Sequence, residues 1–155
     1  MRYDLIYEPD EDSFLLGNEL KKFHNLKVLD LGTGSGIQAE TALKFTKNVL
    51  AVDINKEAVN SVKKKGIKAR VSDLFSNVKG KFDLIILNPP YLPDENLEDN
   101  ESKRITTGGR YGYEILKRFF SQVNNHLSKN GKILIVFSSL TNKNKINKII
   151  KKNNF

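Results

Sequence analysis

The chain has 155 residues, 39% of them hydrophobic, and this length and composition predict one globular domain spanning residues 1–155. It contains no apolar run of the roughly 18 residues that a transmembrane helix needs, and the absence of cysteine excludes disulfide and thiolate chemistry. We expect a cytoplasmic protein, because residues 1–4 also lack the pattern of a signal peptide. The net charge of +8 is compatible with an anionic partner such as RNA, or with lysines scattered over solvated surfaces.

Helical and strand-like segments alternate along the chain. The expected helices are residues 11–23 (with Phe14, Leu15, Leu20 and Phe23 at helical spacing), 37–45, 56–65, 114–127 and a final segment that carries Ile146, Ile149 and Ile150. The expected strands are short apolar runs at residues 27–31, 48–53, 67–72, 82–87 and 132–137, the last preceded by a turn at Asn130-Gly131. This alternation is typical of an α/β fold with a parallel sheet and right-handed crossovers.

Asn88-Pro89-Pro90-Tyr91 directly follows the apolar run at residues 82–87. Two prolines cannot continue a sheet, and the residue before a proline is held extended. Asn88 is therefore expected at the carboxyl end of a strand, where open α/β sheets bind ligands. The Asn88 side-chain oxygen and the Pro89 carbonyl, beside the ring of Tyr91, suit a planar NH2 group. The alternative is an ordinary turn that ends the strand.

Residues 30–36, Asp-Leu-Gly-Thr-Gly-Ser-Gly, form a glycine-rich passage from strand to helix, which lets a ligand approach the backbone closely. A dinucleotide site requires a glycine at position 37, which is isoleucine, and the Gly-Lys-Ser/Thr of a phosphate-binding loop is absent. The spacing suits a cofactor without a pyrophosphate. The carboxylate of Asp30 would fit the ammonium and sulfonium groups of S-adenosylmethionine.

Two further acids lie at the ends of predicted strands. Asp53 ends the second strand and is expected to accept hydrogen bonds from ribose hydroxyls; alternatively it is an acid preceding the next helix. Asp73 follows the third strand and would accept from an adenine amine, with the Leu74 N–H donating to the ring, or it caps a turn.

Together, residues 30–36, Asp53, Asp73 and residues 88–91 resemble the class I S-adenosylmethionine-dependent methyltransferases. Residues 7–16, Tyr-Glu-Pro-Asp-Glu-Asp-Ser-Phe-Leu-Leu, resemble the opening of the archaeal and eukaryotic HemK-type release-factor glutamine methyltransferases. Residues 106–112 are similar to that family's Gly-Gly-Arg-x-Gly segment. The resemblance implies a Rossmann-like fold with a parallel sheet of order 3-2-1-4-5 and flanking helices. It also implies methyl transfer to the glutamine amide in the GGQ motif of a class I release factor.

The resemblance also implies roles for individual residues. The expected contacts to S-adenosylmethionine come from Ser13, Asp30, Gly32, Thr33, Gly34, Gly36, Asp53, Ile54, Asp73, Leu74 and Asn88. Among these, Asp30 and Gly32 would hold the methionine part, Asp53 the ribose, and Asp73 with Leu74 the adenine. Asn88, Pro89, Pro90 and Tyr91 would bind the substrate amide, and no metal site is expected.

A small zinc-binding activator subunit is a further implication of the resemblance. The third strand, residues 67–72, should lie at a sheet edge that is open to strand addition, so proline at Lys68 or Arg70 is predicted to block docking. Bacterial relatives begin with a helical domain, and the family continues past the final helix into an antiparallel strand pair. We therefore expect a shortened chain whose fifth strand has an open outer edge.

Two other functions remain open from the sequence. The first is methyl transfer to adenine or guanine amines of RNA or DNA. These amines are planar like the amide of glutamine, so Asn88-Pro89-Pro90-Tyr91 would suit either substrate. However, the five acids within residues 92–109 would repel phosphates, whether that segment is a substrate-facing lid or a solvated loop. A non-catalytic module that only keeps the cofactor pocket is the second alternative, although the intact motif argues against it.

Overall fold

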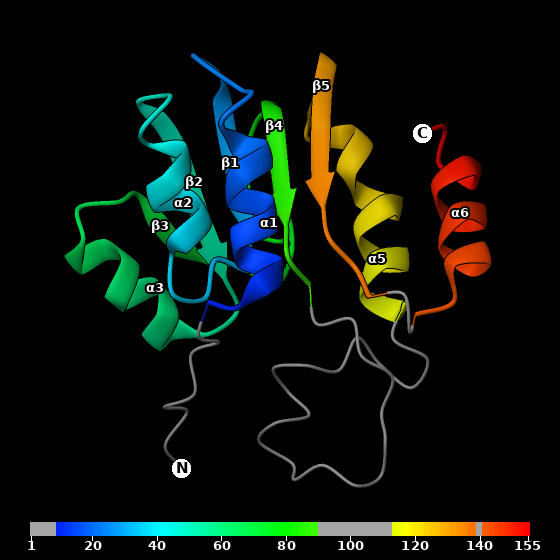
Figure 1. Cartoon of the computed structure of the whole chain (residues 1–155), viewed down its shortest axis with the longest axis horizontal. Coiled ribbons are helices and arrows are strands. Elements are labelled where there is room, and N and C mark those ends of the chain that lie inside the picture. Colours follow the sequence, from blue (N-terminus) through cyan, green and yellow to red (C-terminus); the bar gives the residue numbers. More distant parts are fainter. Residues whose placement is uncertain (1–8, 90–112, 139–140) are drawn as a thin grey trace, which may run out of the picture. The chain divides into compact units, whose positions relative to one another are not determined.

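The computed structural model describes residues 9–89, 113–138 and 141–155, and its helices and strands alternate as expected (Figure 1). The chain divides into two compact units, residues 1–88 with 126–136 and residues 89–125 with 137–155. The first unit holds the sheet and three helices. The described part of the second holds two α-helices and a short 3₁₀ helix. The expectation of a single domain stays a prediction.

The sheet has five parallel strands in the order β3-β2-β1-β4-β5. The strands are β1 (Lys27–Leu31), β2 (Asn48–Asp53), β3 (Ala69–Val71), β4 (Phe82–Leu87) and β5 (Leu127–Ile135). The predicted order 3-2-1-4-5 is therefore confirmed. Because all strands are parallel, their carboxyl ends meet at one edge of the sheet, which is the lower edge in Figure 1.

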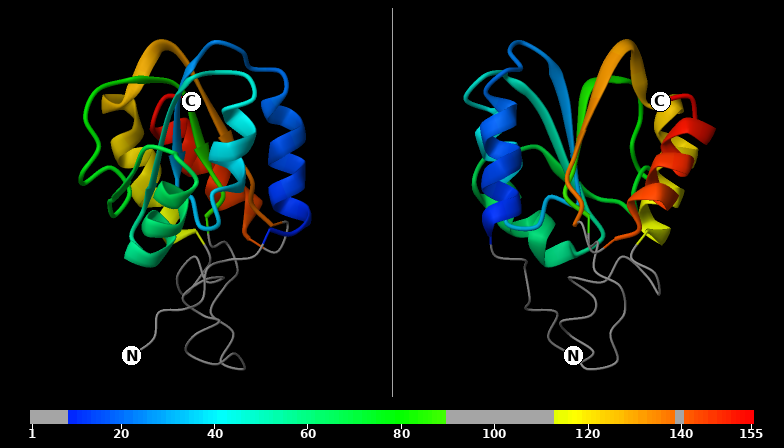
Figure 2. Two further views of the ribbon diagram at one scale, coloured as in Figure 1. Left: turned by 90° about the vertical axis from the view of Figure 1, so that its left-hand side faces the viewer. Right: turned by 45° about the vertical axis from the view of Figure 1, so that its right-hand side comes forward.

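Three helices cover one face of the sheet in the first unit (Figure 2): α1 (Glu11–Leu20), α2 (Ile37–Ala42) and α3 (Lys56–Lys64). Their shared core contains Leu16, Leu20, Ala39, Ala42 and Val62 from the helices and Val28, Val49, Ala51, Leu84 and Ile86 from the strands. Burying these side chains is the main force that holds the helices on the sheet. α1 ends at Leu20 rather than at residue 23, and it leaves Phe14 and Leu15 about 60% exposed.

The second unit contains α5 (Glu114–Gln122), the 3₁₀ helix η1 (Val123–Asn125) and α6 (Lys143–Lys152). α5 and α6 pack together, and the rings of Phe120 and Phe155 lie 5.7 Å apart between centroids. Across the described residues, no helix combines the length and the apolar character needed to cross a bilayer.

The start of β5 corrects the sequence-based prediction. The expected helix at 114–127 ends at Gln122, and β5 begins at Leu127 and runs through the expected turn at Asn130-Gly131. Phe82 pairs with Leu127 but Leu84 pairs with Lys132, so β5 carries a bulge here. A Cβ on Gly131 would lie 2.7 Å from Leu127 Cδ1 and 3.0 Å from the Phe82 carbonyl oxygen. The glycine is therefore required by close packing in the bulge, and not by a chain reversal.

Candidate active site

Polar side chains of the first unit gather where β1, β2 and β4 end. The glycine-rich loop follows β1, Asp53 is the last residue of β2, and Asn88 follows β4 directly. The amino end of α1 reaches the same edge, because its Asp12 and Ser13 contact Asn88. The sheet topology thus brings together residues that are up to 76 positions apart in the sequence.

Asp30 is buried in β1, with 2% of its surface exposed. Its Oδ2 accepts a hydrogen bond from Thr33 Oγ1 at 2.6 Å and another from the Ala39 backbone N–H at 3.1 Å. Burial raises the pKa of Asp30 from 3.8 to about 6; the two hydrogen bonds oppose this rise, and the nearby charge of Asp53 adds to it. The carboxylate therefore ties the loop to α2, while its expected contact with a cofactor stays a prediction.

The glycine-rich loop uses backbone conformations that favour glycine. Gly32, Gly34 and Gly36 have φ values of +67°, +51° and +88°. A Cβ on Gly36 would lie 2.8 Å from Val62 Cγ2, so this glycine allows α2 and α3 to pack closely. A Cβ on Gly32 would meet nothing within 4 Å, which leaves open space beside the loop where a ligand can approach its backbone.

Alanine at Gly32 and at Gly36 should therefore have different effects. Gly36→Ala combines a left-handed φ with a clash, and we expect it to lower the free energy of unfolding by about 2–4 kcal/mol. Gly32→Ala has the left-handed φ alone and should cost about 1–2 kcal/mol, but it places a methyl group in the open space. Denaturant unfolding and calorimetric titration with S-adenosylmethionine would check both variants. A Gly32→Ala variant with unchanged cofactor affinity would contradict this assignment of the open space.

Asp53 fastens the loop to the end of β2. Its Oδ2 accepts from the Gly34 backbone N–H at 2.9 Å, and its Oδ1 accepts from the Asn55 N–H at 2.8 Å. Each carboxylate oxygen keeps a further lone pair, so Asp53 can still accept from hydroxyl groups of a ligand. The next residue, Ile54, has 70% of its surface exposed and offers an apolar face at the same edge of the sheet.

Asp73 and Leu74 form a tight turn after β3. The Asp73 N–H donates to Ser76 Oγ at 3.0 Å, and the Ser72 hydroxyl donates to the Leu74 carbonyl at 2.7 Å. Leu74 has a φ of +47°, a conformation that residues other than glycine rarely adopt. Backbone strain of this kind is often found at binding sites. The predicted contact of this turn with adenine stays a prediction.

Asn88 is the residue whose surroundings are most informative. Its Nδ2 donates to Asp12 Oδ2 at 3.2 Å and lies 3.5 Å from Ser13 Oγ, at the limit for a hydrogen bond. Its Oδ1 is buried and accepts no hydrogen bond from the residues that the structure describes. A buried acceptor without a donor is costly, which points to a donor supplied by a ligand. Pro89 follows as expected, while Pro90 and Tyr91 lie outside the described residues.

Sequence reasoning missed two residues of this site. Asp12 belongs to the segment at residues 7–16 that resembles the family's opening, but no role was predicted for it, although it contacts Asn88. Gln38 is 4% exposed, and its Nε2 donates to the Ser13 carbonyl at 2.7 Å, which joins α2 to the start of α1. A glutamine among the apolar residues of a helix's buried face was the available signal for Gln38.

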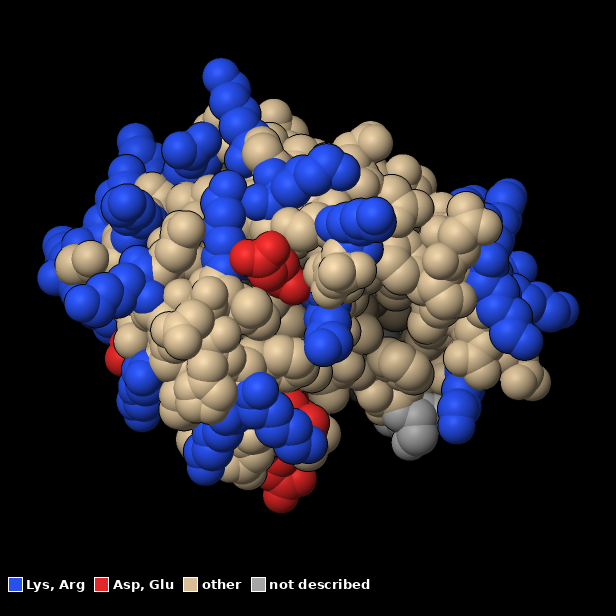
Figure 3. Space-filling view, turned by 90° about the horizontal axis from the view of Figure 1, so that it is seen from above, with Lys and Arg blue, Asp and Glu red and all other residues tan. Residues whose placement is uncertain are grey.

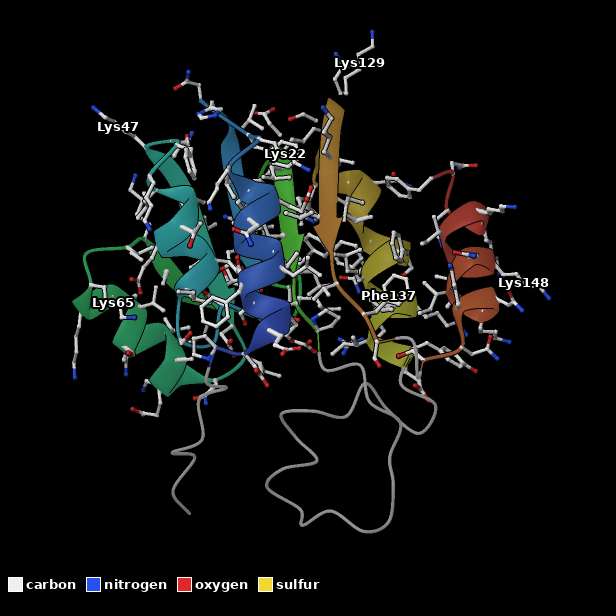
Figure 4. The ribbon with its side chains drawn as sticks, viewed as in Figure 1. Lys22, Lys47, Lys65, Lys129, Phe137 and Lys148 are labelled. Carbon is white, nitrogen blue, oxygen red and sulfur yellow. The ribbon has the colours of Figure 1, made fainter. Side chains whose placement is uncertain are left out.

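Charge is distributed unevenly between the two ends of the sheet in the first unit. The site edge carries Asp12, Asp30, Asp53 and Asp73, and the opposite edge carries exposed lysines in the segments that lead into the strands. Figure 3 views the molecule from that opposite edge, where basic side chains predominate. Lys47 and Lys129, labelled in Figure 4, extend from it. Basic side chains thus predominate at the edge opposite Asn88, although Lys56 begins α3 just after β2 and Lys65 donates to the Ser35 carbonyl of the glycine-rich loop.

Comparison with known proteins agrees with this geometry. Residues 7–154 match the methyltransferase small domain family. A protein of Methanocaldococcus jannaschii, provisionally named as a protein N5-glutamine methyltransferase, is 44% identical over 93% of this chain and 78% of its own length. Mouse methyltransferase HEMK2 is 31% identical over 94% of this chain and 78% of its own. The chain spans 43% of the release factor glutamine methyltransferase of Borreliella burgdorferi, which it also matches.

A solved structure of a methyltransferase complex is also similar to this chain. The E. cuniculi Mtq2–Trm112 complex, described as responsible for methylation of the translation termination factor eRF1, aligns with a TM-score of 0.77 and 27% identity. The alignment covers 94% of this chain and 82% of the other. The chain belongs to the methyltransferase small domain family, and its cofactor is S-adenosylmethionine. The open space at Gly32, the spare lone pairs of Asp53 and the exposed Ile54 fit that cofactor.

Proposed function

We propose that this protein transfers the methyl group of S-adenosylmethionine to the side-chain amide nitrogen of a glutamine in the GGQ motif of a class I release factor. The observation that carries the proposal is the Oδ1 of Asn88, which has no partner among the described residues. This oxygen is buried just after the carboxyl end of β4, at the edge of the sheet where the glycine-rich loop also lies. An N–H of a substrate amide would supply the missing donor.

The amide nitrogen of glutamine is a weak nucleophile, because its lone pair is delocalised into the carbonyl. The cofactor supplies an electrophilic methyl group on a positive sulfur. The residues of the site would contribute by placing the nitrogen in line with that methyl group. As positive charge develops on the nitrogen, Asn88 Oδ1 and the Pro89 carbonyl would accept its N–H groups more strongly. Pro90 and Tyr91 are proposed to complete the substrate contacts.

The local geometry supports the proposed cofactor contacts. We assign the methionine part to Asp30, Gly32 and the loop through Thr33, Gly34 and Gly36. Asp53 would accept from the ribose hydroxyls, and Ile54, Asp73 and Leu74 would border the adenine. Ser13 is brought to Asn88 by α1, which supports a place for its hydroxyl between cofactor and substrate.

The charge distribution favours a protein substrate over a nucleic acid. Four carboxylates lie at the site edge of the first unit, and exposed lysines predominate at the opposite edge. An RNA held by those lysines would not present a base to Asn88. The relatives named for glutamine methylation support the release factor as substrate, and a substrate of this kind predicts a cytoplasmic location.

The test is transfer of labelled methyl groups to an archaeal or eukaryotic-type class I release factor, to its GGQ-to-GGA variant and to total RNA. We expect label on the release factor that disappears with the glutamine change. Label on RNA alone would replace the proposal with the nucleic-acid function. Cofactor binding without transfer to any of these, with and without the activator subunit, would instead support a non-catalytic module.

A small zinc-binding activator is the partner we propose, docked on the outer edge of β3. The E. cuniculi neighbour is itself a complex of two proteins, Mtq2 and Trm112. β3 is an edge strand of the sheet, and its Val71 has 42% of its surface exposed. An added strand would pair with the outward-facing backbone groups of β3.

The backbone pattern of β3 corrects the position at which proline tests this docking. The Lys68 carbonyl accepts from the Ala51 N–H, and the Ser72 N–H donates to the Asp53 carbonyl, so alternate residues including Arg70 face β2. Proline at Lys68 or Arg70 would therefore disturb the sheet itself. Val71→Pro removes an outward N–H and should abolish complex formation with the activator in co-purification. Val71→Ala is the matched control, and equal binding by both variants would exclude this edge.

A further inference from the structure

The amino end of α1 holds the Asn88 side chain in a single orientation. Asp12 Oδ2 lies 3.2 Å from Asn88 Nδ2, and Ser13 Oγ lies 3.5 Å from the same nitrogen. Ser13 Oγ donates its own hydrogen to Asp12 Oδ1 at 3.2 Å, which leaves its oxygen as an acceptor toward Asn88. Both neighbours of the Asn88 amide on this side are thus acceptors.

This arrangement matters because the two ends of an asparagine amide are almost equal in shape but opposite in hydrogen bonding. If Asn88 rotated by 180° about its last side-chain bond, its oxygen would face the Asp12 carboxylate, and two acceptors would meet. The nitrogen, a donor, would then face the substrate. The acceptor oxygen of Asp12 therefore keeps the Asn88 oxygen on the side that faces the substrate.

The helix start that carries the Asp12 carboxylate is itself held firmly in place. Ser13 is 2% exposed, and its carbonyl accepts from the buried Gln38 side chain at 2.7 Å. Leu16 and Leu20, one and two turns further along α1, are part of the core on the sheet. Asp12 therefore belongs to a helix start that is anchored to α2 and to the sheet, and it is not a freely moving surface acid.

We propose that Asp12 is a positioning residue that orients the Asn88 amide, and that by doing so it makes the site select a carboxamide over a carboxylate. A glutamine amide offers N–H donors to Asn88 Oδ1, whereas a glutamate would place a carboxylate oxygen against it. The proposal rests on the proposed function for its substrate, but the orientation of Asn88 can be measured without any substrate.

The first experiment is nuclear magnetic resonance of the full chain with cofactor, following the side-chain amide signals of Asn88. These signals are identified as the pair missing from the Asn88→Ala spectrum. Asp12→Ala should shift this pair, because its nitrogen loses a carboxylate acceptor, and Asp12→Asn should restore part of the shift through its amide oxygen. Glu11→Ala, the matched control, removes an exposed acid from the same turn and should leave the pair in place. Unchanged Asn88 signals in Asp12→Ala would overturn the proposal.

The second experiment compares a GGQ release factor with its GGQ-to-GGE variant. The wild-type protein should bind the glutamine form about tenfold more tightly or better, and Asp12→Ala should bring that ratio toward one and lower kcat about tenfold, with cofactor affinity retained. A purely structural role would weaken both forms by one factor and leave the ratio unchanged, and that result would also overturn the proposal. If the wild type methylates no glutamine, the proposed function fails, and the spectra still decide the role of Asp12.

Discussion

Asn88→Ala is expected to lower kcat by about 10²–10³, the loss that follows removal of one preorganised group acting on developing charge. The affinity for S-adenosylmethionine should change little, because the cofactor is assigned to the glycine-rich loop, Asp53 and the turn after β3. The Asn88 oxygen has no other partner among the described residues, so its removal deprives the reaction of an acceptor. The variant also removes the hydrogen bond from Asn88 Nδ2 to Asp12. Single-turnover methyl transfer and calorimetric cofactor binding, measured on the same preparations, separate the loss of kcat from any change in cofactor affinity.

Asn48→Ala is a suitable control for this variant. Asn48 is exposed and begins β2, so it lies at the edge of the sheet opposite Asn88. We expect wild-type kcat and wild-type cofactor affinity from it. Parallel losses of kcat and cofactor affinity in Asn88→Ala would show that Asn88 serves mainly the cofactor, and its role toward the substrate amide would have to be abandoned.

Asp30→Asn should make the cofactor-free protein more stable at neutral pH while weakening cofactor binding. Burial raises the pKa of Asp30 from 3.8 to about 6, so the folded protein favours the neutral carboxyl. Each unit of this difference corresponds to about 1.4 kcal/mol, and the charged form costs the folded state up to about 3 kcal/mol above pH 6. Asparagine keeps an acceptor for Thr33 and the Ala39 N–H without that cost.

The sign of the pH dependence follows from the raised pKa. Below about pH 4 the carboxyl is protonated in both the folded and the unfolded chain, so wild type and Asp30→Asn should melt at similar temperatures. Between pH 4 and 6 the unfolded carboxyl ionises first, and wild-type stability falls relative to the variant. Above pH 6 the variant should melt up to about 10 °C higher. Scanning calorimetry across this range, without cofactor, measures the effect.

Asp83→Asn provides a control of the opposite sign. The backbone N–H of Lys27 donates to Asp83 Oδ2 at 3.0 Å, and this bond lowers the pKa of Asp83. Because the pKa of Asp83 is lower in the folded protein, the ionised carboxylate stabilises the fold at pH values above the pKa of Asp83 in the unfolded chain. This stabilisation is lost as the pH falls, and Asp83→Asn should be less stable than the wild type at neutral pH. Its cofactor affinity should not change, because β4 begins at the opposite edge from the site. Equal cofactor affinity in Asp30→Asn and wild type would exclude a role for the Asp30 charge.

The elements of the first unit were largely predictable from local patterns. Apolar runs bounded by glycine, asparagine or proline located β1, β2 and β4 at their observed limits, because a buried strand needs a continuous apolar segment. Local patterns failed where contacts distant in sequence decide the structure. Asn130-Gly131 has the composition of a turn, but the approach of Leu127 and the Phe82 carbonyl makes it part of a bulge in β5.

The buried face of the helix predicted at residues 11–23 was also decided by contacts that are distant in the sequence. Phe14 and Leu15 share the helical spacing, yet α1 turns Ser13, Leu16 and Leu20 toward the sheet and leaves both exposed. Helical periodicity specifies that one face of a helix is buried, but the neighbouring elements select which face it is. In this case the buried face includes Ser13, whose hydroxyl oxygen lies 3.5 Å from Asn88 Nδ2.

The sequence by itself determined the class of the fold and the residues that resemble a methyltransferase site, because both depend on composition and spacing within short segments. The strand order was implied by the family resemblance, and not by any local pattern. The tertiary structure decided how those segments meet. Only the packing of α1 on α2 and the sheet brings Asp12 to Asn88 across 76 positions. The same tertiary structure buries the Asn88 oxygen where no other described residue donates to it. The orientation of one amide, on which the choice of substrate is proposed to depend, is a property of contacts between distant residues, and no local sequence pattern encodes it.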